Sequence, residues 1–584
     1  MHWIDYTIIA SYMAFAVGVG IFFSRKASKD SESFFLGGRS MPWWAIALSM
    51  VATSFASDTP IWVTEVTREH GLQRLWWVII SVLPLIIGIF LFSRLWRRAG
   101  IITDAEFYEL RYDGKPAAFL RGFRAFSSGI IQNLFTIAWV TFAMSTVISV
   151  LIPGVDKEQA VILCMVIATF YAVFSGFYGV VATDVVQFFV TMGSMLLLAI
   201  MAVNSAGGME TVLEQVRAAD GYGETTLALF PDFSTFNADV AKILLIFTLV
   251  WWSDASGYNM QRMAACRDEK DAIRSTLFYA LFQSCRPWLW VVVGLVSIAV
   301  FPELDKHSEA YPRVISEYAG VGLKGLLVTA FMAAFMSTVD THLNWGASYL
   351  TVDFYKRFIK KDAQQSHYVM VSRAFMVALM VAGYFFVRMV DSVTQVMESL
   401  SYMLAAGGIV SVLRWFWWRI SAWTEIAALV GGFAGWAIYS FIPGDTLFLG
   451  VAWKEVDWVF KIAMLVSVVF PLSILVTFLT QPTSPEVLER FYKKVRPGGA
   501  WGATSKKVGK VEGSAFALSS WLDVAGGVML CYGLSLSIGY ATLLKFVPSA
   551  ICLLASGVGG YLVYIWYGNE SERLKGELIT EPEK

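Results

Sequence analysis

Long apolar stretches constrain the fold of this 584-residue chain more than any other feature. A helix needs about 20 predominantly apolar residues to cross the hydrocarbon core of a bilayer. Lipid offers no hydrogen bonds to the backbone, so spanning segments are helices or closed barrels. Suitable stretches begin near residues 4, 43, 74, 123, 159, 183, 240, 274, 322, 367, 393, 421, 457, 519 and 546. We therefore predict an all-α polytopic membrane protein with about 15 transmembrane helices.

Composition agrees with this class and argues against several others. Residues are 57% hydrophobic and 15% charged, with zero net charge, so no basic field is available for nucleic acid. The sequence has no P-loop or zinc-finger spacing and no evident catalytic constellation, so we expect neither an ATP-driven pump nor an enzyme. No obligatory protein partner is evident. We interpret the five scattered cysteines as reduced packing residues: Cys164, Cys266, Cys285, Cys531 and Cys552.

The distribution of positive charge predicts the orientation in the membrane. If the N-terminus lies outside, the segments on the cytoplasmic side carry 32 of the 45 Lys and Arg residues. Cytoplasmic loops are enriched in Lys and Arg. We therefore expect a multi-pass protein of the plasma membrane (the bacterial inner membrane), with the N-terminus outside and the C-terminus in the cytoplasm.

Two of the apolar stretches are interrupted by a polar run that opens on Ser-Asp. The second stretch contains Ser-Asp-Thr-Pro at residues 57–60, and the seventh contains Ser-Asp-Ala-Ser-Gly at residues 253–257. Broken helices at membrane depth are tolerated where their backbone lines a cavity or binds a ligand. Matching breaks in two halves are typical of a transporter's central site, and their odd spacing of five spans predicts inverted repeats.

This pattern divides the chain into seven parts. They are an N-terminal extra helix with a cytoplasmic loop (1–40), a first five-helix repeat (41–204), an extracellular loop (205–239), a second inverted repeat (240–420), additional transmembrane helices (421–480), a cytoplasmic loop (481–515), and a C-terminal helix pair with a cytoplasmic tail (516–584).

The ninth stretch carries a row of oxygen-bearing side chains. Ser337, Asp340 and Thr341 lie at i, i+3 and i+4, so they share one helical face. Hard cations prefer oxygen ligands, so an ion site is one interpretation. The other is that the hydroxyls bond back to their own helix and the small residues pack helices together. An ionised Asp340 costs roughly 3 kcal/mol or more in the membrane, so it requires a cation, a proton or an arginine.

Five motifs occur along the chain in a characteristic order. They are Phe34-Phe35-Leu36-Gly37-Gly38-Arg39-Ser40-Met41-Pro42-Trp43-Trp44, Thr103-x-x-Glu106-Phe107 with Arg111-Tyr112, Thr183-Asp184-x-x-Gln187, Gln261-Arg262 with Ala264-Ala265, and Asp353-Phe354-Tyr355-Lys356. Over roughly residues 1–480 this set resembles the sodium:solute symporter family, which includes sodium/glucose, sodium/proline and sialic acid transporters. The resemblance implies a fold of the leucine-transporter type, with inverted five-helix repeats.

The resemblance also implies sodium sites. The family's common site combines two backbone carbonyls at the first break with three groups of the ninth span. The matching positions are Ala52, Phe55, Ala334, Ser337 and Thr338.

A second site, found in some members, matches Asp184, Asp340 and Thr341, together with Ser337. Asp340 departs from the pattern, because those members usually carry a hydroxyl there. Two carboxylates would hold a second cation more strongly, or one of them would carry a proton. Asp184 has a second interpretation, as the N-cap of a helix.

The family's solute-contacting positions map onto both breaks and two other spans. They correspond to Asp58, Thr59, Trp252, Gln283, and Gln395 or Ser399. Carboxylates, amides and aromatic rings suit a neutral, hydroxyl-rich solute.

Two further polar residues lie inside apolar stretches. Arg286 would bind an anionic solute or pair with Glu398, Asp254 or Asp340. His342 would relay a proton or pack helices.

The resemblance thus implies a sodium-coupled secondary active symporter that imports a small polar solute, with a sugar or polyol favoured. Uptake of an amino acid, sialic acid or another carboxylate is the alternative, as is a transporter-like sensor. The expected partners are the solute, sodium ions and membrane lipid.

Overall fold

The computed structural model describes residues 1–27, 29–152, 154–234, 236–249, 252–253, 257–389, 393–509 and 518–580. Within these ranges, ten helical stretches are long and apolar enough to cross a membrane. The all-α class is confirmed, because the described strands amount to one antiparallel pair, β1 (Leu447–Phe448) and β2 (Val451–Ala452). The count of about 15 spans stays a prediction.

The first half of the chain consists of helices joined by short turns and by 3-10 or π-helical segments. They are α1 (Trp3–Ala27), α2 (Ser31–Leu36), η1 (Gly37–Arg39), α3 (Trp43–Thr53), α4 (Asp58–His70), η2 (Leu72–Leu75), α5 (Trp76–Ile79), α6 (Val82–Ile87), η3 (Gly88–Phe92), α7 (Ser93–Ala99), α8 (Glu106–Arg111), α9 (Gly114–Phe126), η4 (Ser127–Gln132), α10 (Asn133–Leu151), α11 (Lys157–Ser205) and α12 (Met209–Ala218).

The second half is built in the same way. Its helices are α13 (Ala238–Leu249), α14 (Tyr258–Ala265), α15 (Glu269–Cys285), α16 (Pro287–Val300), η5 (His307–Glu309), α17 (Ala310–Tyr318), α18 (Leu323–Ser348), η6 (Tyr349–Ile359), α19 (Gln365–Val387), α20 (Val393–Phe416), α21 (Ala422–Phe441), η7 (Trp453–Glu455), α22 (Trp458–Leu479), α23 (Pro485–Val495), α24 (Gly502–Val508), α25 (Leu518–Thr542) and α26 (Phe546–Thr580).

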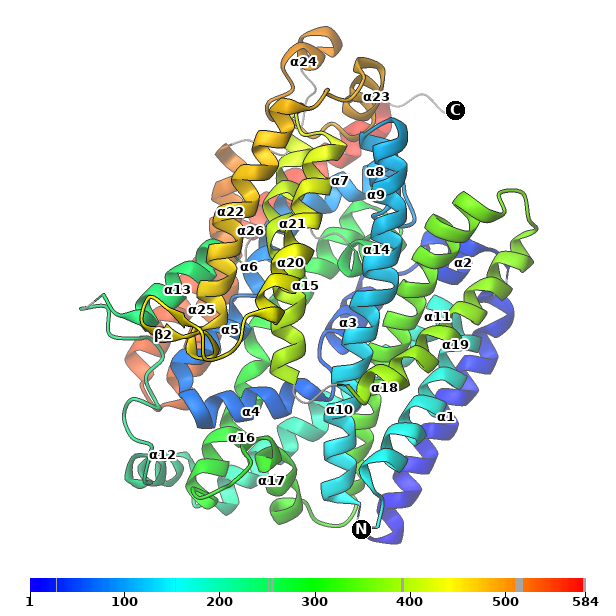
Figure 1. Cartoon of the computed structure of the whole chain (residues 1–584). Coiled ribbons are helices and arrows are strands. Elements are labelled where there is room, and N and C mark those ends of the chain that lie inside the picture. The colour runs from blue at the N-terminus through cyan, green and yellow to red at the C-terminus, as the bar shows by residue number, and fades with distance from the viewer. Residues whose placement is uncertain are drawn as a thin grey trace.

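The two broken helices run in opposite directions, as inverted repeats require. In Figure 1, α4 lies below α3, whereas α14 lies above α13. The N-terminus and α17 lie at the foot of this view and α23 near its top. We call these two ends of the bundle the α17 end and the α23 end.

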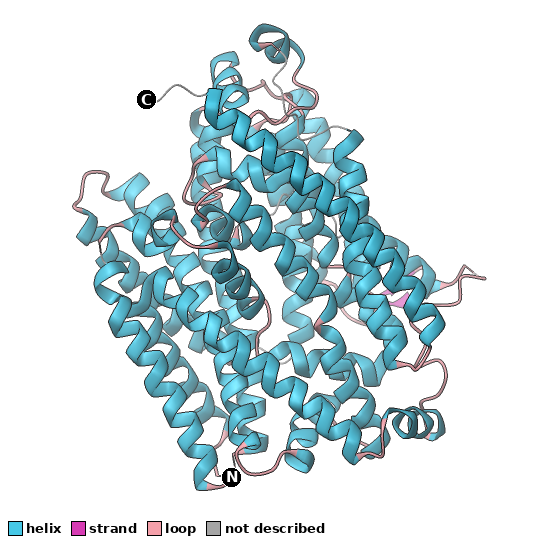
Figure 2. Ribbon diagram, turned by 180° about the vertical axis from the view of Figure 1, so that it is seen from behind, coloured by secondary structure: helices cyan, strands magenta, loops and turns pink. Residues whose placement is uncertain are grey.

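The long helices α11 and α18 pack against each other in the interior, and α1 and α10 pack against both. Seen from behind, the molecule is helical throughout, with the small strand pair at its side (Figure 2). The hairpin of α25 and α26 packs on α15 and α6. The side chains of the sodium-site candidates on α11 and α18 are buried: Asp184 of α11 and Ser337, Thr338 and Asp340 of α18.

Helix α11 contains a sharp bend at Gly176, whose φ of 52° and ψ of −173° are not helical. Glycine adopts a positive φ without strain because it has no Cβ. The predicted spans that begin near residues 159 and 183 are therefore two helical arms joined directly at this bend.

Residues 481–515, predicted to be a loop, contain α23, α24 and a buried anchor. Trp501 is 1% exposed, and the Ala500 amide donates to the Phe416 carbonyl at the end of α20, at 2.6 Å. In α23, Leu488, Phe491 and Val495 lie at helical spacing and are buried. The Pro, Gly and Lys residues of this segment conceal that short apolar face.

Candidate functional site

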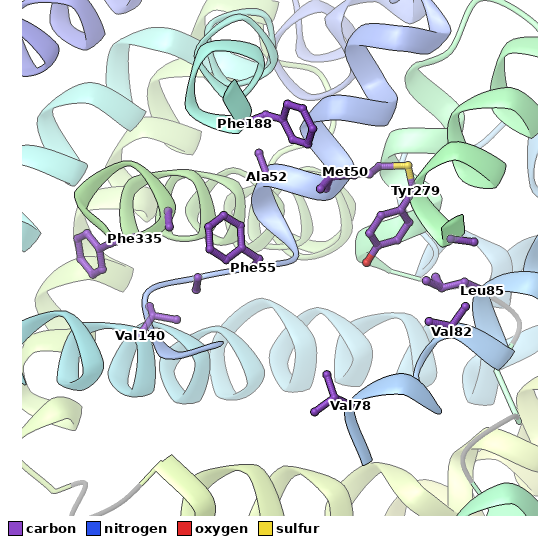
Figure 3. Close-up of a cluster of buried hydrophobic side chains, with 14 of the residues drawn as sticks. Met50, Ala52, Phe55, Val78, Val82, Leu85, Val140, Phe188, Tyr279 and Phe335 are labelled. Atoms are coloured by element: carbon purple, nitrogen blue, oxygen red, sulfur yellow. The ribbon is translucent and has the colours of Figure 1, made fainter. Parts of the chain in front are cut away.

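The first break separates α3, which ends at Thr53, from α4, which begins at Asp58. Ser57 is fully buried, and its Oγ donates to the Val140 carbonyl of α10 at 2.9 Å. The last carbonyls of a helix have no partner within the helix. Figure 3 shows Ala52 and Phe55 at this end of α3. The break thus holds backbone oxygens in the interior of the bundle.

The predicted hydroxyls of α18 lie beside this break. Thr338 Oγ1 donates to the Thr53 carbonyl at 3.3 Å, and the side chain of Ala334, one turn earlier in α18, is also buried. Thr53 stands between Ala52 and Phe55 in the sequence. A hydroxyl that donates its proton keeps lone pairs for a cation. The structure therefore brings the α3 and α18 parts of the predicted common sodium site together.

Asp184 of α11 lies between the same two helices. Its carboxylate accepts from Ser337 Oγ of α18 at 2.6 Å and from Ser49 Oγ of α3 at 2.5 Å. All three side chains are fully buried. The alternative of Asp184 as an N-cap is wrong, because the residue lies well inside α11.

Asp340 lies one turn after Ser337 and differs sharply from Asp184. It is fully buried, and neither of its carboxylate oxygens has a hydrogen-bond partner among the residues that the structure describes. The charged neighbours that act on it are Asp184 and Arg262 of α14. Arg262 donates from Nη2 to Thr341 Oγ1 at 2.8 Å. The predicted pairing of Arg286 with Asp340 is therefore wrong, and Arg262 is the arginine nearby.

Arg286 is 4% exposed and binds the end of α3. Its Nη1 donates to the Val51 carbonyl at 2.9 Å and to Ser54 Oγ at 3.1 Å, and its Nη2 donates to the Ser54 carbonyl at 2.6 Å. The guanidinium also lies over the rings of Phe55 and Trp290, at 5.7 and 5.8 Å from their centroids. Its hydrogen-bond partners are thus backbone and hydroxyl oxygens rather than the predicted carboxylates, of which Asp254 lies outside the described residues.

Two polar side chains of this region were missed by sequence reasoning. Ser49 lies one turn before Thr53 in α3, a spacing that would have placed both hydroxyls on one face. The other is Tyr12 of α1, whose hydroxyl accepts a hydrogen bond from Gln187 Nε2 at 2.7 Å. Gln187 lies one turn after Asp184 in α11. Nothing in the sequence of the N-terminal helix indicates this contact.

His342 packs between aromatic rings. Its ring is stacked on Tyr258 at 5.5 Å and meets Trp345 edge to face at 5.6 Å, while Nδ1 lies 2.9 Å from Asn133 Oδ1. These contacts favour the helix-packing interpretation.

The predicted solute positions do not form one group around a cavity, as the predicted sodium positions do around the first break. Asp58 is 8% exposed and Thr59 is half-buried; Asp58 Oδ1 and Gln283 Oε1 are buried and lack a hydrogen-bond partner in the described part of the chain. Trp252 and Ser399 are half-buried. The side chain of Gln395 lies outside the described residues.

A cavity of about 280 Å³ extends from the second break toward the α23 end. Its lining includes Trp252 and Ser253 at the break, Tyr258 of α14, and Tyr108 and Arg124 of α8 and α9. Of the predicted solute positions, Trp252 alone lines this cavity among the described residues.

Several motif residues stabilise the α23 end instead of forming a ligand site. Thr103 Oγ1 and Arg121 Nε donate to the Asp353 carboxylate at 2.6 and 2.7 Å. Arg111, fully buried, donates to carbonyls that follow α20, including that of Trp417 at 3.2 Å, and Tyr112 donates to Glu425 at 2.6 Å. These contacts tie α8 to α9, η6, α20 and α21.

A separate ion cluster surrounds Asp457. Asp457, before α22, pairs with Arg74 at 3.1 Å and with Lys242 of α13 at 3.2 Å. Burial acts to raise the pKa of Asp457, but the Val459 amide and the charges of Arg74 and Lys242 outweigh it, so the pKa lies below its ordinary value. The cluster joins α22 to the second broken helix.

Comparisons with known proteins identify a family and several similar chains. The sequence pattern of the sodium:solute symporter family matches residues 34–435. The sodium/glucose cotransporter of Vibrio parahaemolyticus is 26% identical over 476 residues, which are 76% of this chain and 86% of that protein. The sodium/myo-inositol cotransporter of Bos taurus is 24% identical over 481 residues, 74% of this chain and 66% of that protein.

A substrate-bound, outward-open structure of a Na⁺-coupled sialic acid symporter is similar with a TM-score of 0.67 and 19% identity. The match covers 83% of this chain and 99% of that one. This likeness confirms the leucine-transporter type of fold.

Proposed function

We propose that this chain, which belongs to the sodium:solute symporter family, is a sodium-coupled symporter that imports a small, neutral, hydroxyl-rich solute. The observation that carries the sodium part is the contact of Thr338 with the Thr53 carbonyl at 3.3 Å. It places hydroxyls of α18 next to backbone oxygens of a broken helix. Oxygen-only surroundings suit a hard cation such as Na⁺.

A second cation is proposed at Asp184 and Asp340, with Thr341 and Ser337. The support is Asp340, whose two oxygens are buried without a hydrogen-bond partner in the described residues. A buried carboxylate without a partner is strongly unfavourable, and a bound cation would offset that cost. Arg262 supplies one positive charge to the two carboxylates and leaves a net negative charge for a cation to balance.

The proposal of a neutral solute rests on the arginines of this region, because an acidic solute needs a cationic side chain that is free to pair with it. The Arg286 guanidinium is buried against the Val51 and Ser54 carbonyls. The two arginines that line the cavity already pair with carboxylates, Arg124 with Asp104 at 2.9 Å and Arg414 with Glu425 at 3.2 Å. A sugar or polyol fits better, in keeping with the similarity to glucose and myo-inositol cotransporters. The cavity at the second break, about 280 Å³, is at the lower end of the range for ligand pockets and suits a small solute.

We assign the α23 end to the cytoplasm, because the segments there are rich in Lys and Arg. The cavity toward that end then belongs to a state that faces inward. Transport would follow from sodium binding more tightly in the outward-facing state than in the inward-facing one, since coupling requires different affinities in the two states. One sodium ion moving down about 100 mV and a tenfold gradient supplies roughly 2.3 plus 1.4 kcal/mol, enough for several-hundredfold accumulation.

The test is uptake by the purified chain in proteoliposomes under an inward sodium gradient. A thermal-shift screen with and without sodium, over sugars, polyols, amino acids and carboxylates, would first select the solutes. Sodium-dependent accumulation of a sugar or polyol is expected. Accumulation of a carboxylate alone would contradict the neutral-solute assignment, and sodium-dependent stabilisation without uptake of any solute would favour a sensor.

A further inference from the structure

Arg286 occupies an unusual place for a buried arginine. It lies where α15 meets α16, directly before Pro287. Its side chain extends to the C-terminal end of α3, where it donates to the Val51 carbonyl. The guanidinium donates three hydrogen bonds to oxygens of Val51 and Ser54. The proposed sodium carbonyls belong to Ala52 and Phe55. Val51 directly precedes Ala52 in the sequence, and Ser54 directly precedes Phe55.

The chemistry of this contact is that of a helix C-cap. The final carbonyls of α3 have no successors in the helix, and the partial negative charge at a helix C-terminus attracts a cation. A planar guanidinium satisfies two carbonyls and a hydroxyl at once, which an ammonium group does not do in the same geometry. The rings of Phe55 and Trp290 hold the guanidinium plane from the sides.

We propose that Arg286 is a positioning residue for sodium: it caps α3 through the Val51 and Ser54 carbonyls and thereby fixes the direction of the Ala52 and Phe55 carbonyls. This inference rests on the proposed sodium site. Two carbonyls of the break are held by Arg286, so the intervening and following carbonyls keep one orientation. A ligand set that is already oriented binds its ion without the entropic cost of ordering the loop.

The same contact has a consequence for coupling. Helices α3 and α15 pack closely, so Arg286 keeps the α3 part of the sodium site together with α15. The remaining ligands, Ser337 and Thr338, lie on α18. Relative motion of α3 and α18 therefore opens the site as a whole, and sodium affinity differs between the two states.

The test compares Arg286→Gln and Arg286→Lys with the intact chain. The half-saturating sodium concentration for uptake, and for sodium-dependent thermal stabilisation, is expected to rise at least tenfold in Arg286→Gln, with the maximal uptake rate changed much less. Arg286→Lys keeps the charge but loses the planar cap, so it is expected to resemble Arg286→Gln more than the intact chain.

Arg111→Gln is the matched control, because Arg111 is fully buried and in a similar way donates to carbonyls at the C-terminal end of α20, those of Arg414 and Trp417. It is expected to lower thermal stability without changing the half-saturating sodium concentration. Ser54→Ala removes one of the three Arg286 contacts and also the bond that Ser54 Oγ donates to the Val51 carbonyl at 3.1 Å. A smaller rise in that concentration is expected even if both Arg286 variants fail to fold.

An unchanged sodium response in a folded Arg286 variant, or in Ser54→Ala when neither folds, overturns the inference. Loss of uptake of acidic solutes alone, with normal sodium dependence, also overturns it and makes Arg286 a solute ligand. Absence of any sodium response in the intact chain would instead overturn the proposed function itself.

Discussion

Two neighbouring turns of α18 show different ways of placing oxygens inside a membrane protein. At the first, the hydroxyl turn, Ser337 donates to the Asp184 carboxylate and Thr338 donates to the Thr53 carbonyl, so both hydroxyls have an acceptor. At the second, the Asp340 turn, the carboxylate of Asp340 is equally buried, yet its oxygens have no hydrogen-bond partner in the described structure.

The difference indicates different dependence on an ion. Neutral hydroxyls and carbonyls are stable without a cation and bind one weakly, which permits release. An unpartnered buried carboxylate is unfavourable until a cation arrives. We therefore expect the hydroxyl turn to set the sodium dependence of transport and the Asp340 turn to set the number of ions that accompany each solute.

The largest effect is expected from Ser337→Ala combined with Thr338→Ala, which removes both hydroxyls that face α3 and α11. Sodium activation of uptake should be lost, with the half-saturating concentration raised by about a hundredfold or more. Sodium-dependent uptake in proteoliposomes is the measurement. Sodium activation like that of the intact chain would show that the hydroxyls of Ser337 and Thr338 do not set the sodium dependence.

Asp340→Asn is expected to have the next largest effect. Removal of the charge should lower the sodium-to-solute flux ratio from two to one, and the accumulation limit from the order of 10⁵-fold to several hundredfold. Parallel measurement of sodium and solute fluxes gives the ratio.

The control for Asp340→Asn is His342→Gln, two residues further along α18, where the ring packs on Tyr258. It should leave the flux ratio unchanged. A ratio of two in Asp340→Asn would remove this residue from the ion site, and loss of a proton flux instead would make Asp340 a proton carrier.

Ser49→Ala tests the proposed second cation site more gently, because Ser49 is one of two hydroxyls that donate to Asp184. Hydrogen bonds to charged groups contribute about 1.5–3 kcal/mol, so the second sodium should bind at least about tenfold more weakly. Equilibrium sodium binding measures this. Ser145→Ala, a fully buried hydroxyl of α10 that bonds within its own helix, is the matched control and should have no effect on sodium.

The smallest effect is expected from Asp457→Asn, in the ion cluster with Arg74 and Lys242. The folded-state pKa of Asp457 is lowered, so its stabilising contribution is present above the unfolded-state pKa and disappears as the pH falls through the folded-state pKa. Near neutral pH the variant should lose about 1 kcal/mol, seen as a small drop in melting temperature.

That difference between Asp457→Asn and the intact chain should vanish in acid, and sodium affinity should stay unchanged. A marked loss of sodium affinity would show that charge pairs far from α18 also govern sodium binding.

Much of the architecture could be predicted, because membrane helices leave a strong apolar signal. The break between Thr53 and Asp58, and the proximity of Ser337 and Thr338 to α3, follow from spacing and from the resemblance. Asp184 and Ser337, which the resemblance groups in one site, are hydrogen-bonded in the structure, while their role as sodium ligands stays a prediction.

Other features carry no comparable signal. The acceptors of Arg286 are backbone carbonyls, which every residue has, so the sequence suggested carboxylate partners instead. The short apolar face of α23 is hidden among Pro, Gly and Lys residues. The solute positions come from distant helices, and only Trp252 among the described ones reaches the cavity at the second break.

The most direct test of the account is equilibrium binding of radioactive sodium to the purified protein. We predict two saturable sodium ions per intact chain, and one in each of the single variants Thr338→Ala and Asp340→Asn. Undiminished binding of both ions in Thr338→Ala, or no saturable binding to the intact chain, would contradict the assignment of the sodium site between α3 and α18.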